Sequence, residues 1–269
     1  MSIVIDSAHL KRRVERYLWH DESMPLVYLR QLLKGSFGNF ERVAIIGGLV
    51  RDFARRGSSG FRSDVDLVID APEEAVAALA HKLQASANRF GGYGYRHPNW
   101  KIDFWALETT WAARRGLVVV NELRDLVNCT FFDWDAVLYD LHARRIIAND
   151  DYLDKLRRRR IEINLLPTPS VQGNLLRAVR RLLLWNLEAG PKLKDFIDCH
   201  LDADSFAAIS QIESSIYYNP ILKSFRDEGA LAEQLFSLGK RTLINTDFGE
   251  QLRIPGVEHS KWRLAKGAL

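Results

Sequence analysis

Two short segments in the first quarter of the chain constrain its fold most: a glycine turn after an apolar run, and a pair of aspartates at the start of another. Residues 43–46 are apolar and predict a buried strand, Gly47 and Gly48 allow a sharp turn, and helical spacing follows. Asp64 and Asp66 open a β-branched run that predicts a second strand. The pattern therefore predicts an α+β fold.

The glycine turn is suited to hold an anion. The N–H groups at a helix N-terminus lack backbone partners, and a glycine lets a ligand come close to them. However, Gly47, Gly48 and Arg51 do not have the G-x-G-x-x-G spacing of dinucleotide-binding folds, and no Lys-Ser or Lys-Thr pair completes a P-loop. The turn alone is consistent with a triphosphate site or with an ordinary strand-to-helix connection.

Asp64 and Asp66 stand two residues apart in a predicted strand, so their side chains share one face. Two ionised carboxylates at close range repel each other, and a bound cation would relieve that repulsion. Mg²⁺ prefers carboxylate and phosphate oxygens, and a pair of such ions can stabilise both the attacking and the leaving oxygens of a phosphoryl transfer. The pair therefore predicts a two-metal Mg²⁺ site, with Mn²⁺ as a substitute, or else a strand end with two solvated acids.

The two segments together, Gly-Gly-x-Val-Arg-Asp at 47–52 and Asp-x-Asp-Leu-Val-Ile at 64–69, resemble a known family. They are similar to the head domain of class II tRNA nucleotidyltransferases (CCA-adding enzymes) and bacterial poly(A) polymerases, in the polymerase-beta nucleotidyltransferase superfamily. The resemblance implies that Asp64 and Asp66 hold Mg²⁺. It also implies that the glycine turn, through Gly47 and Gly48, binds the phosphates of an incoming nucleotide such as ATP.

Arg51 lies in the same motif, and the resemblance makes it a phosphate ligand as well. A guanidinium is permanently charged and presents several donors in a planar fork, which suits phosphate oxygens. The alternative is an arginine on the helix surface. Asp52, which follows it, is interpreted as a structural residue that orients Arg51.

A third acid would complete the site. Residues 100–106 alternate so that Lys101, Asp103 and Trp105 share one face of a strand. Asp103 is the candidate for a third metal ligand, or for the base that receives the proton of an attacking hydroxyl. The alternative is an edge-strand acid paired with Lys101 or Arg96.

The resemblance continues, with departures, into residues 131–141, which can be aligned with the family's Asp-Phe-Thr-Ile-Asn-Ala-x-x-Tyr-Asp segment. Phe131 stands where the family has Asp, and Asp135 where it has Asn. Thr130 stands where the family has a nucleotide-binding Arg. These departures argue against the ribose contacts of the family, and the alternative is that residues 126–147 simply form strands of the sheet.

A later segment, residues 175–185, resembles the family's Leu-Arg-Ala-x-Arg helix. The resemblance makes Arg177, with Arg180 one turn on, a candidate nucleotide ligand; the alternative for both is the polar face of an amphipathic helix. The family's base-reading Glu-Asp-x-x-Arg element falls on Ser170, Val171 and Asn174. The side-chain template that selects C or A is thus absent.

The domain prediction has three parts: N-terminal helices at 1–40, a nucleotidyltransferase head at 41–150, and a smaller all-helical, neck-like region at 151–269. The head is predicted to be a mixed sheet with helices on one face. The net charge of +4 is compatible with RNA but does not require it. Two cysteines are too few for a disulfide framework or an all-protein zinc site. No signal peptide or membrane span is evident, so cytoplasmic residence is expected.

The functional prediction is a Mg²⁺-dependent nucleotidyltransferase that moves NMP from an NTP to an acceptor hydroxyl and releases pyrophosphate. An RNA, specifically a tRNA-like 3′ end, is the expected acceptor, without full CCA synthesis. The same chemistry on a small molecule or a protein is one alternative, and a non-catalytic RNA-binding module of the same fold is another. The sequence predicts neither the preferred NTP, nor a protein partner, nor an oligomeric state.

Overall fold

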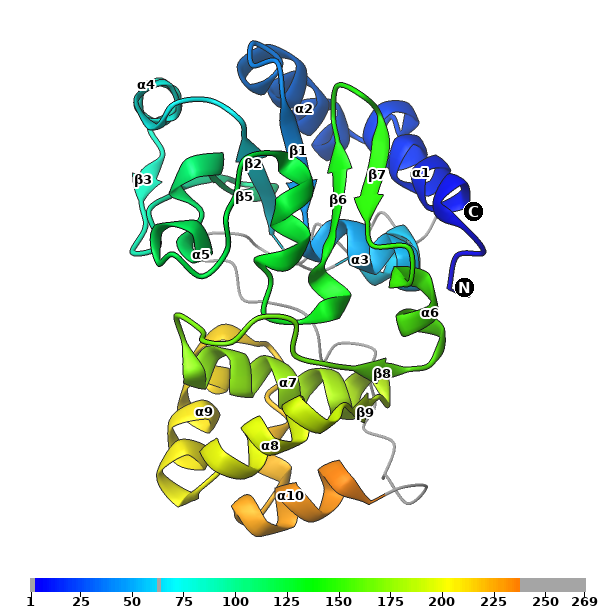
Figure 1. The fold of residues 1–269 in the computed structure, drawn as a ribbon, viewed down its shortest axis with the longest axis vertical. Helices are drawn as coiled ribbons and strands as arrows, with labels where there is room; N and C mark the ends of the chain where they lie inside the picture. The colour runs from blue at the N-terminus through cyan, green and yellow to red at the C-terminus, as the bar shows by residue number, and fades with distance from the viewer. Residues whose placement is uncertain (1–2, 62–63, 238–269) are drawn as a thin grey trace.

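The computed structural model describes residues 3–61 and 64–237, and its centre is a seven-stranded sheet (Figure 1). The strand order is β3-β4-β5-β2-β1-β6-β7, and every neighbouring pair is antiparallel except β2 and β5, which run parallel. The predicted mixed sheet is thereby confirmed. The strands are β1 (Val43–Ile46), β2 (Val65–Ile69), β3 (Ser86–Ala87), β4 (Tyr93–His97), β5 (Trp100–Ala106), β6 (Val137–Asp140) and β7 (Arg145–Ala148).

The longer helices of the head lie on one face of this sheet. They are α1 (Ser7–Glu15), α2 (Met24–Leu32), α3 (Gly48–Arg55) and α4 (Glu73–Leu83). Alternate strand residues such as Ile45 and Leu67 point into the larger hydrophobic core with them. The intervening residues Ala44 and Val68 belong to a smaller core on the other face, which the segment around Leu126 covers. The period-two alternation of the strands thus builds two layers on the sheet.

The rest of the described chain is mainly helical and lies beyond one end of the sheet (Figure 1). The short helices α5 (Trp111–Arg114) and α6 (Tyr152–Arg157) precede it, and a small parallel pair, β8 (Arg160–Ile161) and β9 (Glu188–Ala189), accompanies it. Its helices are α7 (Val171–Trp185), α8 (Pro191–His200), α9 (Ala203–Ile216) and α10 (Glu228–Phe236). The predicted helical region extends to residue 269, so its last part lies outside the described residues.

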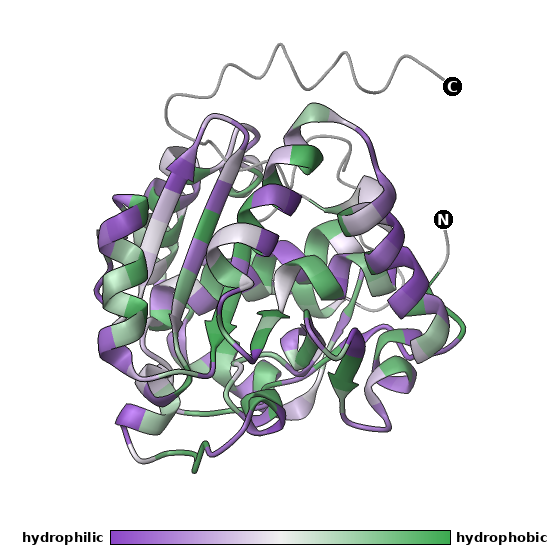
Figure 2. Ribbon diagram, turned by 90° about the horizontal axis from the view of Figure 1, so that it is seen from above, coloured by the Kyte–Doolittle hydropathy of each residue, from purple (hydrophilic) through white to green (hydrophobic). Residues whose placement is uncertain are grey.

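The helices and sheet bury their apolar faces against each other. Coloured by hydropathy, the ribbon is largely green in the interior and more purple along the outer helices (Figure 2). One continuous cluster of buried apolar side chains includes sheet residues such as Phe104 and helix residues such as Leu182. Among the described residues, no helix is both long and apolar enough to cross a membrane.

The turn from β1 into α3 requires glycine. Gly47 has φ +69 and donates its N–H to the carbonyl of Val137 at 2.9 Å, and its own carbonyl accepts from the N–H of Arg51 at 2.9 Å. A side chain at Gly47 would find space, since the nearest atom, the carbonyl oxygen of Asp135, would be 3.8 Å away. The need for glycine is therefore conformational.

We expect Gly47→Ala to lower the free energy of unfolding by about 1–3 kcal/mol, because alanine must adopt a backbone conformation that suits glycine. Urea unfolding followed by circular dichroism measures the change. Gly35→Ala is the matched control, because Gly35 has open space and no positive φ. An equal loss in both variants would contradict the conformational argument.

Candidate active site

The sheet brings the three predicted acids together. Strands β2 and β5 are parallel neighbours, and their register sets Asp66 directly opposite Asp103. Asp64 comes two residues before Asp66. All three line one cavity of about 630 Å³, together with Gly47 and Gly48. The carboxylates and the glycine turn, which were separate motifs in the sequence, therefore share one site.

Cations from the same sheet lie among these carboxylates. The ammonium of Lys101 contacts Asp64 and lies 3.7 Å from an oxygen of Asp103. Arg96 donates to Asp103 at 3.1 Å. Asp103 thus has both of the cation partners, Lys101 and Arg96, that the alternative interpretation of the sequence proposed. It also lies next to Asp66, as a third metal ligand would.

The carboxylate face nevertheless keeps an excess of negative charge. Burial raises the pKa of Asp66 to about 7, and the nearby charges of Asp64 and Asp103 add to this effect while Lys101 and Arg177 oppose it. Burial also raises the pKa of Asp64, against the opposing effect of Lys101. Carboxylates that are costly to ionise together, beside an open cavity, form a donor set that fits a divalent cation.

The described part of the chain does not hold a ready-made metal cluster. No three histidine, cysteine or acidic side chains in it are already arranged to coordinate an ion. Lys101 bridges Asp64 and Asp103 in this arrangement. The set therefore fits a cation by its chemistry, and binding requires the carboxylates to turn towards it.

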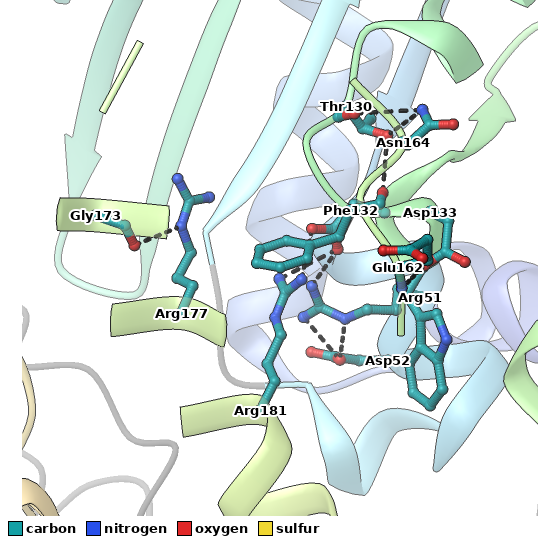
Figure 3. A network of polar contacts seen from close by, with 12 residues as sticks. Arg51, Asp52, Thr130, Phe132, Asp133, Glu162, Asn164, Gly173, Arg177 and Arg181 are labelled. Atoms are coloured by element: carbon teal, nitrogen blue, oxygen red, sulfur yellow. Dashed lines mark hydrogen bonds and ion pairs between the residues drawn. The ribbon is translucent and has the colours of Figure 1, made fainter. Parts of the chain in front are cut away.

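Arg51, predicted to bind phosphate, is engaged by two internal carboxylates (Figure 3). The side chain is buried, its Nε donates to Asp52 at 2.9 Å, and its Nη1 lies 2.5 Å from Asp135. Although burial opposes its charge, Asp52 and Asp135 together hold the pKa of Arg51 well above the ordinary value. The interpretation that Asp52 orients Arg51 agrees with this geometry.

Asp135 also binds a second arginine, Arg181, which the sequence did not single out. Arg181 of α7 donates to the two carboxylate oxygens at 2.8 and 3.2 Å. Burial opposes ionisation of Asp135, but Arg181 and Arg51 outweigh it and hold the pKa of Asp135 well below its usual range. Burial lowers the pKa of Arg181 to about 10. Asp135, at the position where the resembled family has Asn, thus occupies two arginines that line the cavity.

The other two predicted arginines differ from each other. Arg177 is exposed on α7, donates its Nε to the carbonyl of Gly173 at 3.3 Å, and lines the cavity (Figure 3). Arg180 is buried instead, paired with the fully buried Glu213 of α9 and stacked 3.6 Å above the ring of Tyr217. Both arginines line the cavity, but Arg180 also joins α7 to α9 through Glu213, whereas Arg177 has no carboxylate partner among the described residues.

The segment that aligns with the family's base-reading element has local structural contacts. The Ser170 hydroxyl caps α7 by accepting from the N–H of Gly173 at 3.2 Å, and the Asn174 side chain donates to the hydroxyl of Thr168. Val171 is exposed. These residues form the helix start and supply no pair of charged side chains with which to read a base.

A comparison with protein-family profiles found no match to the chain, and a comparison with curated proteins found no significant match. Its fold is that of a nucleotidyltransferase head domain followed by helices. Two solved structures with this fold are a CCA-adding enzyme from Thermotoga maritima complexed with tRNA and a CCA-adding enzyme complexed with ATP. The match to the first structure covers 87% of this chain and 56% of that enzyme, with 19% sequence identity and a TM-score of 0.51. The match to the second structure covers 82% of this chain and 58% of that enzyme, with 17% sequence identity and a TM-score of 0.50.

The chain spans just over half of the length of these two structures, 56% of the first and 58% of the second. The resemblance that the sequence motifs indicated is confirmed at the level of the fold. The roles of individual residues depend on the geometry described above.

Proposed function

We propose that this protein is a divalent-cation-dependent nucleotidyltransferase that transfers NMP from an NTP to an acceptor hydroxyl. The observation that carries the proposal is the alignment of Asp66 opposite Asp103, with Asp64 adjacent, in the cavity that the glycine turn borders. A nucleotidyltransferase fold supports it but does not by itself imply activity.

Each group has a role in this reaction. Asp64 and Asp66 would hold Mg²⁺, which, when bound, neutralises phosphate charge and favours ionisation of the acceptor hydroxyl. The acceptor oxygen forms a bond to the α-phosphorus, the bond from that phosphorus to the bridging oxygen breaks, and pyrophosphate leaves. Asp103 is placed to bind the cation or to take the acceptor proton. The N–H groups at the start of α3, which follows Gly47, and the guanidinium of Arg177 would hold phosphate oxygens.

RNA with a tRNA-like 3′ end is the proposed acceptor. The support is a net charge of +4 and the fold shared with a CCA-adding enzyme that was solved with tRNA. Ser170, Val171 and Asn174 replace the charged base-reading element, which argues against complete CCA synthesis. A transferase that adds one kind of nucleotide is consistent with that loss.

The assay that tests the proposal supplies Mg²⁺ and each α-labelled NTP in turn, with and without total RNA. We expect label to enter RNA with one preferred NTP and to require the divalent cation. Label in a protein or a small molecule instead would favour the alternative acceptors. No label in any fraction, together with retained RNA binding, would favour a non-catalytic module of the same fold.

Arg177→Ala is expected to raise the KM for NTP about tenfold, the effect of losing roughly one charge-assisted hydrogen bond to phosphate. The fold should tolerate the change because the side chain is exposed. Steady-state kinetics over a range of NTP concentrations measures it. Arg158→Ala is the control, since Arg158 is an exposed arginine that does not line the cavity. An unchanged KM would remove Arg177 from the nucleotide site.

A further inference from the structure

The carboxylate face of the sheet carries its own cation in a fixed place. Lys101 precedes Ile102, which is the register partner of Val65, and Asp64 precedes Val65. Lys101 therefore lies across from Asp64 on the neighbouring strand, and it shares a face with Asp103, two residues further along β5. Its ammonium contacts Asp64 and is 3.7 Å from Asp103, so it bridges two of the three acids.

A second cation approaches Asp103 from the other side. Gly94 of β4 is the register partner of Asp103. A Cβ at Gly94 would come within 2.9 Å of the Asp103 carboxylate and within 2.8 Å of the Arg96 guanidinium. The absence of a side chain at Gly94 thus leaves room for Arg96 to donate to Asp103 at 3.1 Å. Both cations come from the hairpin of β4 and β5.

The charges of these side chains limit the number of divalent cations that the site can hold. Asp64, Asp66 and Asp103 carry three negative charges when ionised, and Lys101 and Arg96 supply two positive charges within ion-pair distance of them. Lys101 and Arg96 therefore take up carboxylate charge that metal ions would otherwise neutralise. Two divalent cations would bring four positive charges close to an ammonium, and like charges at such distances repel strongly.

We infer that Lys101 takes the place of one of the two divalent cations, so that this site binds a single Mg²⁺ or Mn²⁺ with the nucleotide. The inference rests on the proposed function, because it concerns the same site. Asp66 and Asp64 would share the single ion with the triphosphate. Lys101 would supply fixed positive charge between Asp64 and Asp103.

Counting bound Mn²⁺ by the loss of its free electron paramagnetic resonance signal tests this. The titration uses the whole chain, first with Mn²⁺ alone and then with the α,β-methylene analogue of each NTP. We expect one Mn²⁺ in total per wild-type chain with the analogue bound, after subtraction of the ions held by analogue that remains free in solution. Lys101→Met should bind a second Mn²⁺, and Lys101→Arg should return to one. Lys11→Met is the matched control, since Lys11 pairs with Glu15 on the surface of α1.

The outcomes separate this inference from the proposed function. Two Mn²⁺ in the wild type, or the same count in wild type and Lys101→Met, would overturn the role of Lys101 and leave the metal site standing. No Mn²⁺ in any variant would overturn both. If circular dichroism shows that Lys101→Met does not fold, the Mn²⁺ counts of the wild type and of Lys101→Arg still test the inference, because more than one Mn²⁺ in either would overturn it.

Discussion

Replacing Asp64 and Asp66 together by asparagine is expected to reduce nucleotidyl transfer by at least about a thousandfold, because groups that act as a unit in the transition state are lost together. The same double variant should be more stable than the wild type at pH 8 when EDTA has removed metal ions. The first effect is measured by incorporation of labelled nucleotide at saturating NTP, and the second by urea unfolding. Opposite signs for activity and stability are expected of a site built for binding.

The pH dependence of the stability difference follows from Asp66. Burial raises its pKa in the folded protein from 3.8 to about 7. The folded state therefore holds the proton more tightly than the unfolded chain does. Its contribution to stability is fully present below about pH 4 and is lost as the pH rises through about 7. The loss is at most about 4 kcal/mol, at about 1.4 kcal/mol for each pKa unit, and smaller in proportion to the water that reaches the cavity.

Asparagine cannot ionise, so the single substitution Asp66→Asn should remove this pH dependence of stability. The wild type and Asp66→Asn should then have the same free energy of unfolding near pH 4. Asp154→Asn is the control, because Asp154 is an exposed acid of α6 whose partner is the nearby Arg157. A wild type that is as stable at pH 8 as the Asp66 variant in EDTA would show that the folded protein accommodates the charge without cost.

The strands of the site could be predicted from local sequence. The apolar run at 43–46 and the β-branched run at 65–69 coincide with β1 and β2 because each is short, buried and bounded by glycine or polar residues. The alternation of residues 100–106 gave the shared face of Lys101 and Asp103 because side chains alternate along any strand. These features depend on neighbours within a few residues.

The contacts that decide what the site residues do are distant in sequence, and no local pattern contains them. The parallel pairing of β2 with β5, which sets Asp66 opposite Asp103, depends on a crossover through α4 and the β3–β4 hairpin. Arg51 and its partner Asp135 are 84 residues apart, and Arg180 and Glu213 are 33 apart. The one available signal was Asp135 itself, an acid where the resembled family has Asn.

Asp135→Asn is therefore expected to have two large effects. Arg51 and Arg181 are buried and both donate to this carboxylate. Its loss leaves Arg181 without that partner and Arg51 with Asp52 alone. Removing one partner of such a network costs about 3–5 kcal/mol of stability. The same change should strengthen binding of inorganic triphosphate, because the two guanidinium groups then have donors to offer to phosphate oxygens in the cavity.

Thermal unfolding with increasing triphosphate measures both effects in one experiment. The variant should melt at a lower temperature than the wild type without ligand, and triphosphate should raise its melting temperature by more, since a ligand stabilises in proportion to its affinity. Asp133→Asn is the matched control: Asp133 is also buried but accepts from the N–H of Glu162 at 3.0 Å and has no arginine within ion-pair distance among the described residues. A destabilised Asp135 variant that gains no triphosphate affinity would show that Arg51 and Arg181 serve only the packing of α3 against α7. A gain would mean that Asp135 acts in place of phosphate in the ligand-free protein and lowers the affinity for the nucleotide.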